Sequence, residues 1–209
     1  VFEQYETLTA NTSSITDEDG LGSGGFSYQW YADGQIISGA TSSTFTLTQT
    51  EVDKKIQAEV SYTDEQNTSE TITSDETVEI ENVDDTPTGQ PVIEGTVNGT
   101  ATQNDTLTVN TNSIYDEDGI GSGGFSYQWT ADGVQIDGAN AQTLTLDQSL
   151  VGKSIAAEVS YTDSYGVMET IESNPTAAVQ NVNDPLTGSI SIVGNLAKGQ
   201  IVSINDNLS

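Results

Sequence analysis

Two stretches of the sequence are nearly identical: residues 17–30 read DEDGLGSGGFSYQW, and residues 116–129 read DEDGIGSGGFSYQW. They differ only at Leu21 and Ile120, and the tryptophans that end them lie 129 − 30 = 99 residues apart. A repeat of this length corresponds to a whole domain rather than to one layer of a solenoid. The sequence therefore predicts that the chain contains the same domain more than once.

The same period extends through the rest of each copy. Residues 61–64, SYTD, recur as residues 160–163, and residues 82–85, NVDD, recur as residues 181–184, NVND. We expect three parts, which are residues 1–85, a repeat that lacks its first strand; residues 86–184, a complete repeat; and residues 185–209, the leading strands of a third repeat.

Apolar residues alternate with polar residues along short segments, which is typical of half-buried β-strands. Phe26, Tyr28 and Trp30 are an example, and turn signals such as Asp33-Gly34 separate the segments. About seven short strands in about 100 residues, with a Trp on the third and a Tyr on the sixth, predict an all-β fold of tandem immunoglobulin-like β-sandwich domains. The clearest expected strands cover residues 7–11, 26–31, 44–48, 55–62 and 70–80, and their counterparts cover residues 106–110, 125–130, 143–147, 154–161 and 169–179.

The composition excludes several classes of function. The chain has 32 acidic residues, four lysines, no Arg and no His, which gives a formal net charge of −28. Binding to nucleic acid or to anionic membranes needs Lys or Arg, so neither partner is expected. Without His or Cys, a Ser/His or Cys/His nucleophile is impossible. A hydrolase with paired carboxylates stays open on composition, but duplicated loops favour a structural role, and we expect no enzyme.

Clusters of acidic residues lie in two loops of each repeat and in the linkers. In a sandwich of this topology both loops lie at the end where the chain enters from the preceding repeat. Clustered carboxylates suit Ca2+, which takes six to eight oxygen ligands, whereas the absence of His and Cys disfavours zinc and copper. The alternative is that these acids are solvated loop residues. The candidate Ca2+ ligands are Asp17, Glu18, Asp19, Asp64, Asp84, Asp85, Asp116, Glu117, Asp118, Asp163, Asn183 and Asp184.

One site is expected to bind Ca2+ between the first two repeats. There Asp84 or Asp85 would join Asp116 and Asp118, with Glu117 and Asp163 as further ligands, because the linker meets the two loops in this topology.

Several motifs carry a resemblance to a known family. They are Asp-x-Asp-Gly-x-Gly, Ser-Tyr-Gln-Trp-x-Ala-Asp-Gly, Val-Ser-Tyr-Thr-Asp and the linker NVNDP at residues 181–185. Together they resemble the tandem bacterial Ig-like extender repeats of giant RTX adhesins. The resemblance implies type I secretion, an extracellular location on the surface of a Gram-negative cell, and roles in cell adhesion and biofilm formation. It also implies a long stalk, made rigid by Ca2+, that holds a ligand-binding region away from the cell.

The expected function is therefore a structural extender, whose partners are neighbouring repeats of the same polypeptide. The first alternative is a carbohydrate- or cell-contact binding module of a secreted protein, for which Tyr165 is the candidate exposed ring. The second is an accessory domain of a secreted enzyme. No signal peptide or membrane span is visible in the sequence, and direct membrane insertion is not expected.

The tail of the chain carries a strand pattern of its own. Ile190, Ile192, Val202 and Ile204 alternate with polar residues, whereas nothing in the first repeat corresponds to residues 91–99. This offset predicts head-to-tail strand exchange between chains, in which the tail completes the first repeat of a neighbour. The alternatives are pairing within one chain and residues that precede Val1.

Overall fold

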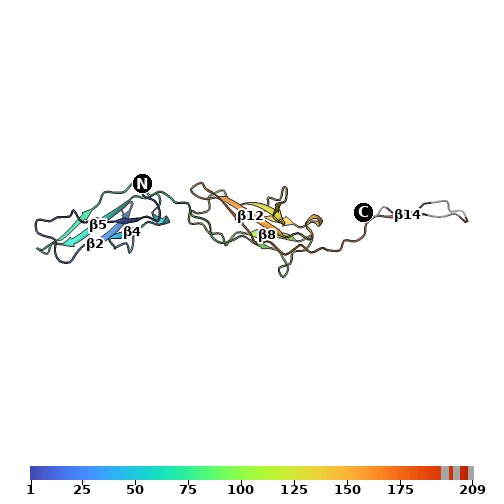
Figure 1. The fold of residues 1–209 in the computed structure, drawn as a ribbon, viewed down its shortest axis with the longest axis horizontal. Helices are drawn as coiled ribbons and strands as arrows, with labels where there is room; N and C mark the ends of the chain where they lie inside the picture. The colour runs from blue at the N-terminus through green and yellow to red at the C-terminus, as the bar shows by residue number, and fades with distance from the viewer. Residues whose placement is uncertain (194–197, 200–202, 207–209) are drawn as a thin grey trace. The chain divides into compact units, whose positions relative to one another are not determined.

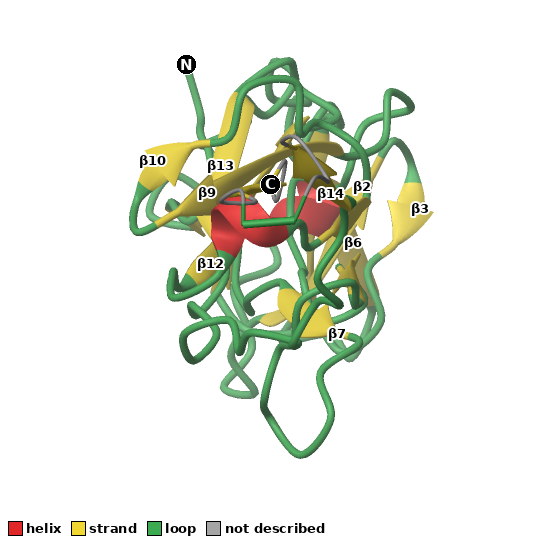
Figure 2. Cartoon of the chain, turned by 90° about the vertical axis from the view of Figure 1, so that its right-hand side faces the viewer, coloured by secondary structure: helices red, strands yellow, loops and turns green. Residues whose placement is uncertain are grey.

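The structure is a computed structural model that describes residues 1–193, 198–199 and 203–206. It confirms the all-β fold class (Figures 1 and 2). Among the described residues, helical structure is limited to two short 3-10 helices, η1 (Gln49–Glu51) and η2 (Gln148–Leu150). No described helix has the length and apolar character needed to cross a membrane.

The first repeat consists of two antiparallel sheets around one core. The larger sheet has the order β3-β2-β5-β6 and the smaller sheet pairs β1 with β4. Trp30, Leu47 and Ile56 are among the large buried residues between them. The strands are β1 (Thr7–Thr9), β2 (Ser27–Ala32), β3 (Gln35–Ile36), β4 (Thr44–Thr46), β5 (Ile56–Thr63) and β6 (Ser69–Thr73).

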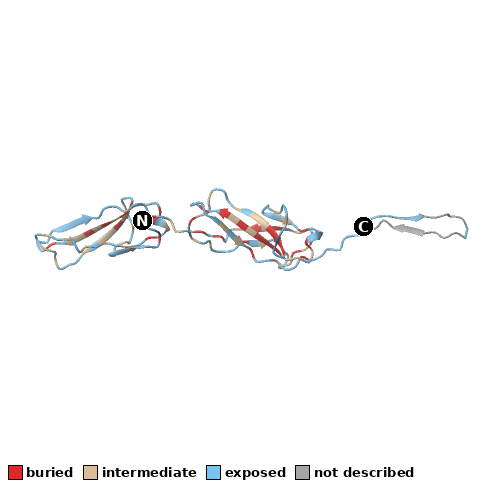
Figure 3. Ribbon diagram, turned by 45° about the horizontal axis from the view of Figure 1, so that its top comes forward, coloured by how far each residue is buried: buried red, intermediate tan, exposed pale blue. Residues whose placement is uncertain are grey.

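The second repeat has the same arrangement with one additional strand. Its larger sheet has the order β10-β9-β12-β13, and its smaller sheet has the order β11-β8-β7. The additional strand β7 pairs antiparallel with β8, with Ile93 opposite Val109. The strands are β7 (Val92–Glu94), β8 (Thr106–Asn110), β9 (Ser126–Ala131), β10 (Val134–Gln135), β11 (Thr143–Thr145), β12 (Ile155–Thr162) and β13 (Met168–Glu172). In both repeats, several of the buried residues lie along the central strands of the larger sheet (Figure 3).

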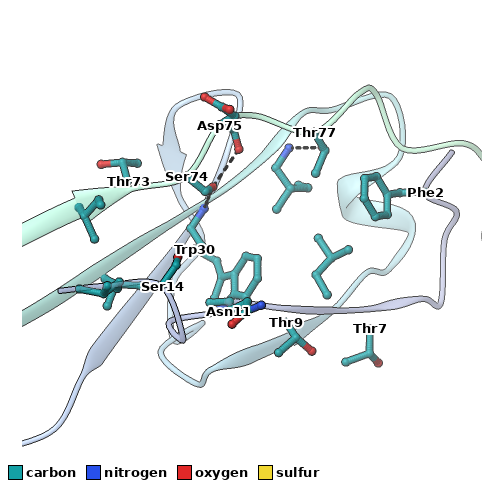
Figure 4. A pocket seen from close by; sticks show the side chains of 17 residues that line it. Phe2, Thr7, Thr9, Asn11, Ser14, Trp30, Thr73, Ser74, Asp75 and Thr77 are labelled. Carbon is teal, nitrogen blue, oxygen red and sulfur yellow. Dashed lines mark hydrogen bonds between the residues drawn. The ribbon is translucent and has the colours of Figure 1, made fainter.

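In both repeats, the last expected strand ends earlier than predicted. We expected strands over residues 70–80 and 169–179, but β6 ends at Thr73 and β13 ends at Glu172. In the first repeat the hydroxyls of Ser74 and Thr77 accept hydrogen bonds from the backbone N–H groups of Ala58 and Ile56. These side-chain hydroxyls accept the hydrogen bonds that backbone carbonyls would accept in a regular strand (Figure 4). The chain therefore bulges between Ser74 and Thr77. Ser173 and Thr176 do the same in the second repeat.

Other strand boundaries also differ from the prediction: the expected strand over residues 7–11 is β1, which ends at Thr9. The expected strands 44–48 and 143–147 end two residues early because Thr48 and Asp147 are the N-caps of η1 and η2. The short strands β3 and β10 were not predicted, although the Asp-Gly turn before each was. In the first turn Asp33 has φ 45° and Gly34 has φ 73°, as a two-residue hairpin of type I′ requires.

The start and the end of each repeat lie side by side. Glu3 forms a parallel bridge with Glu81, and Thr102 forms the equivalent bridge with Gln180. In the first repeat the N–H of Gln4 donates to the carbonyl of Glu81 over 3.0 Å. The first and last segments of each repeat therefore run in the same direction where they are hydrogen-bonded.

The chain divides into two compact units. The first contains Val1–Gly89, Ser113–Phe125 and Ser160–Thr170, and the second contains Gln90–Asn112, Ser126–Val159 and the chain from Ile171. The linker after the first repeat and the two acidic loops of the second repeat thus belong to one unit. The domain boundaries at residues 85 and 184 stay a prediction.

The tail contains a separate two-stranded sheet. In it β14 (Ile190–Val193) pairs antiparallel with β15 (Ser203–Asp206), and Ile192 lies opposite Ile204. Ile190 and Ile192 are 65% and 69% exposed. Val202, which we included in the strand pattern, lies outside the described residues.

Candidate metal site

Three aspartates of the first unit converge. Asp84 lies in the linker, Asp118 in the loop before β9, and Asp163 directly after β12. One carboxylate oxygen from each lies within 4.8 Å of those of the other two. Asp118 and Asp163 are 2% and 4% exposed, whereas Asp84 is exposed. The geometry thus joins three of the predicted ligands from three separate segments.

The loop that carries Asp118 depends on the glycines of its motif. Gly119 has φ 77°, a conformation that other residues rarely adopt. At Gly121 the N–H donates to the carbonyl oxygen of Thr162 over 3.0 Å, and an added Cβ would lie 2.4 Å from the same oxygen. Any larger residue at Gly121 would force this loop away from the end of β12. The Asp-x-Asp-Gly-x-Gly pattern therefore places Asp118 close to Asp163.

Each of the two buried aspartates uses one oxygen within the protein and leaves the other without a partner. Asp163 Oδ1 accepts from the N–H groups of Tyr165 (2.9 Å) and Val167 (2.8 Å), and Asp118 Oδ2 accepts from the N–H of Asp85 (2.7 Å). Asp163 Oδ2 and Asp118 Oδ1 are buried and have no hydrogen-bond partner. A buried carboxylate oxygen without a partner is costly, so these two oxygens indicate a place for a cation.

The electrostatics of the site agree with this reading. Loss of hydration raises the pKa of Asp84 above its ordinary value, and the charges of Asp118 and Asp163 raise it further. The pKa of Glu169 is raised in the same way, first by loss of hydration and then by Asp84 and other aspartates. A divalent cation would remove this repulsion. The all-oxygen donor set fits Ca2+, because Ca2+ prefers carboxylates and accepts irregular coordination.

Two buried glutamines form hydrogen bonds with the linkers, a role that was not predicted from the sequence. The Gln4 side chain is 2% exposed, accepts from the N–H of Val83 (3.2 Å) and donates to Asp85 Oδ2 (2.9 Å). Gln103 accepts from Val182 (3.1 Å) and donates to Asp184 (3.2 Å). The signal in the sequence is that the two glutamines are 103 − 4 = 99 residues apart.

Three of the predicted ligands in the first unit serve other contacts. Asp85 accepts from the Tyr5 hydroxyl (2.5 Å) as well as from Gln4. Asp116 accepts from the Tyr161 hydroxyl and from the N–H of Asp118 (2.9 Å). Glu117 is exposed, and its Oε2 lies 3.3 Å from the Tyr5 hydroxyl. These side chains hold the loop and the linker in place around the three aspartates.

The equivalent acids of the first repeat do not converge with a linker carboxylate among the described residues. Asp17 accepts from the Tyr62 hydroxyl (2.7 Å) and from the N–H of Asp19 (2.8 Å), and Asp64 accepts from the N–H of Thr68 (2.7 Å). Glu18 is exposed. In the second linker Asn183 and Asp184 are also exposed, and in the described part of the chain Asp184 belongs to no cluster of three carboxylates.

Tyr165, the candidate exposed ring, is partly covered and its hydroxyl is hydrogen-bonded. It is 41% exposed, and its hydroxyl accepts a hydrogen bond from Gln49 Nε2 over 3.3 Å. Loss of hydration raises the pKa of this hydroxyl.

Comparison with known proteins gives only distant structural likenesses. No protein-family model matches the chain, and no curated protein matches it. One similar solved structure is described as a Ca2+-stabilized adhesin that helps an Antarctic bacterium reach out and bind ice; it is 12% identical, with a TM-score of 0.33 over 80% of this chain. Another is the Bacteroides ovatus mixed-linkage glucan utilization locus protein SGBP-B in complex with a heptasaccharide, 11% identical, with a TM-score of 0.21 over 74% of this chain. The chain spans 43% and 37% of these two structures.

Proposed function

We propose that the chain is part of a structural extender of a bacterial surface adhesin, in which Ca2+ orders the linker between consecutive repeats. The observation that carries the proposal is the cluster of Asp84, Asp118 and Asp163 with its two buried, unpartnered oxygens. Its three members come from the linker and from two loops of the next repeat, so one ion would tie all three segments together.

In this proposal the domains are residues 1–85, 86–184 and 185–209, and each works through its neighbours in the same polypeptide. The residues that would bind the ion are Asp84, Asp118 and Asp163, with Glu169 adding negative charge nearby. Asp85, Gln4 and Tyr5 would hold the linker in position. The protein would be extracellular, where Ca2+ at millimolar concentration occupies even weak sites. It would have no enzymatic activity.

Calcium titration by calorimetry tests the proposal with matched controls. Asp118→Asn and Asp163→Asn should each weaken the strongest Ca2+ binding at least about tenfold, the effect of losing about 1.4 kcal/mol of binding free energy. The control variants Asp19→Asn and Asp64→Asn change the same loop positions of the first repeat, where the described residues form no cluster of three carboxylates. They should leave this binding unchanged. Equal weakening in all four variants would contradict the site and indicate a general effect of charge.

A further inference from the structure

The turns that follow β5 and β12 have the same hydrogen bonds but different side chains. Each begins at an aspartate, Asp64 or Asp163, whose Oδ1 accepts from the backbone N–H four residues later, over 2.7 Å and 2.8 Å. At the tip of the turn the first repeat has Gln66, and the second repeat has Tyr165, 165 − 66 = 99 residues later. The tyrosine is therefore a special feature of the second turn, and its backbone setting does not require it.

Tyr165 contacts η1 of the first repeat. Its hydroxyl accepts from Gln49 Nε2 over 3.3 Å, and the same nitrogen donates to Asn82 Oδ1 over 3.1 Å. Gln49 is the first residue of η1, which begins in a capping box where the Thr48 N–H donates to Glu51 Oε2 over 3.0 Å. All of these residues lie in the first compact unit. Tyr165 thus meets a part of the first repeat whose own hydrogen bonds fix its conformation.

An unusual backbone conformation occurs near the same hydroxyl. Asp53 has φ 63°, and the equivalent residue of the second repeat is Gly152, with φ 81°. The N–H groups of both residues donate to a backbone carbonyl over 2.9 Å, so each repeat needs this conformation here. Glycine adopts it without strain and aspartate does not, which indicates a role for the aspartate side chain. Loss of hydration raises the pKa of the Tyr165 hydroxyl, and the nearby Asp53 carboxylate raises it further.

We propose that Tyr165 is a docking residue, whose side chain binds a surface of the first repeat formed by Gln49, Asp53 and Asn82. The contact needs no metal ion. The ring contributes apolar area, and the hydroxyl accepts from Gln49 while its proton remains available to the Asp53 carboxylate. The equivalent positions of the other repeat hold a glutamine and a glycine, which provide neither the ring nor the carboxylate. The pair is therefore particular to this linker.

The docked tyrosine also positions a ligand of the proposed Ca2+ site. Its backbone N–H donates to Asp163 Oδ1 over 2.9 Å, whereas Asp163 Oδ2 is the buried oxygen without a partner. Docking on η1 therefore holds Asp163 close to Asp84 before an ion binds. Less conformational freedom then remains to be lost on binding, which increases the affinity for Ca2+. This positioning role rests on the proposed Ca2+ function, whereas the docking itself does not.

Amide hydrogen exchange measured by NMR in EDTA tests the docking. Tyr165→Gln introduces the residue that the first repeat has at the same turn. It should lower the protection of the Val167 amide at least about threefold, because the lost contact allows the turn to open more often. The Thr68 amide, on the equivalent turn of the first repeat, should keep its protection. The control Met168→Gln changes a 74% exposed side chain beside the docked turn and should have no effect.

A double-mutant cycle tests the partner of the tyrosine. Asp53→Gly introduces the residue of the second repeat and should also lower the protection of Val167, and combining it with Tyr165→Gln should cause no further loss. Unchanged protection of the Trp129 amide in the core would show that every variant is folded. The proposal would be overturned by unchanged protection in Tyr165→Gln, by an equal loss in Met168→Gln, or by additive losses in the double variant.

Calcium titration by calorimetry separates the docking from the proposed function. Tyr165→Gln should weaken Ca2+ binding severalfold, and Met168→Gln should not. A loss of protection in EDTA with unchanged Ca2+ affinity would keep the docking and contradict the positioning of Asp163. If the chain bound no Ca2+ while the exchange results held in EDTA, the proposed function would fail and the docking would stand.

Discussion

In the second repeat Leu107 and Val109 are fully buried, whereas in the first repeat Leu8 and Ala10 at the same positions are half-buried. The larger sheets of the two repeats have the same strand order, and both tryptophans donate from Nε1 to a backbone carbonyl over 2.9 Å. The difference lies in β7, a strand of three residues. The presence of one short strand therefore determines whether these core residues are accessible to water.

The largest expected effect is the difference between Leu107→Ala and Leu8→Ala. Leu107→Ala should lower the free energy of unfolding of its repeat by about 2–5 kcal/mol, because it leaves a cavity in a closed core. Leu8→Ala should cost about 1–2 kcal/mol, because Leu8 already contacts solvent. Urea unfolding measured by tryptophan fluorescence follows each repeat separately, with Trp30→Phe silencing the first and Trp129→Phe the second. Equal losses would contradict the difference in closure.

Calcium should stabilise the part of the chain that contains Asp84 more than the tail that contains Asn183. A ligand that binds only the folded state at about 100 times its Kd adds about 2.7 kcal/mol. We expect EDTA to remove a gain of this order, measured as a fall in Tm, and Asp84→Asn to remove part of it. Sodium chloride at high concentration should restore only a fraction of the loss, because screening does not replace a bound ion. Full recovery in salt would indicate general repulsion alone.

The stabilisation by Ca2+ should depend on pH. The pKa values of Asp84 and Glu169 are raised in the folded protein, so their ionisation disfavours folding without a metal ion. This penalty is fully present above the raised pKa values and is relieved as the pH falls through them. Protons then also compete with Ca2+. We therefore expect the difference in Tm between Ca2+ and EDTA to shrink as the pH is lowered from 7 towards 5, and a constant difference would contradict this.

Gln4→Ala and Gln103→Ala test whether the glutamine hydrogen bonds to the two linkers contribute only to stability or also to Ca2+ binding. Each variant removes two hydrogen bonds of a buried side chain, which should cost about 1–3 kcal/mol in urea unfolding. Gln4→Ala should in addition weaken Ca2+ binding, because its partner Asp85 donates its N–H to Asp118. Gln103→Ala should leave that binding unchanged in calorimetry. A similar loss of Ca2+ affinity in both variants would contradict a local role for Gln4.

The smallest expected effect is that of Tyr5→Asn, which introduces the residue found at the equivalent position, Asn104. Tyr5 has φ 69° and Asn104 has φ 73°, a region that asparagine tolerates better. Relief of about 1 kcal/mol should offset the loss of the hydrogen bond to Asp85. Thermal unfolding should shift by less than about 4 °C. A larger fall would show that the tyrosine hydroxyl is more important than the backbone conformation.

The sequence predicted the repeat, the all-β class and the segments that carry the acids, because each leaves a direct mark as a period, an alternation or a run of charges. It did not distinguish Asp118, which joins the cluster, from Asp116, which accepts from Tyr161. That distinction depends on which oxygen each backbone N–H reaches. The role of Gln4 was missed because a single polar residue before a strand resembles any surface residue, and its burial arises only when the linker covers it.

The parallel bridges at Glu3–Glu81 and Thr102–Gln180 have a mechanical consequence. The chain enters and leaves each repeat in the same direction along this contact, so tension pulls the two hydrogen-bonded segments past each other. Under such a shearing load the bonds share the force and must break together, whereas an antiparallel hairpin pulled from its open end unzips one bond at a time. In the first repeat the shared bonds include Gln4 to Glu81 (3.0 Å) and Glu81 to Phe2 (2.9 Å). Each repeat thus resists extension at the point where force would enter it.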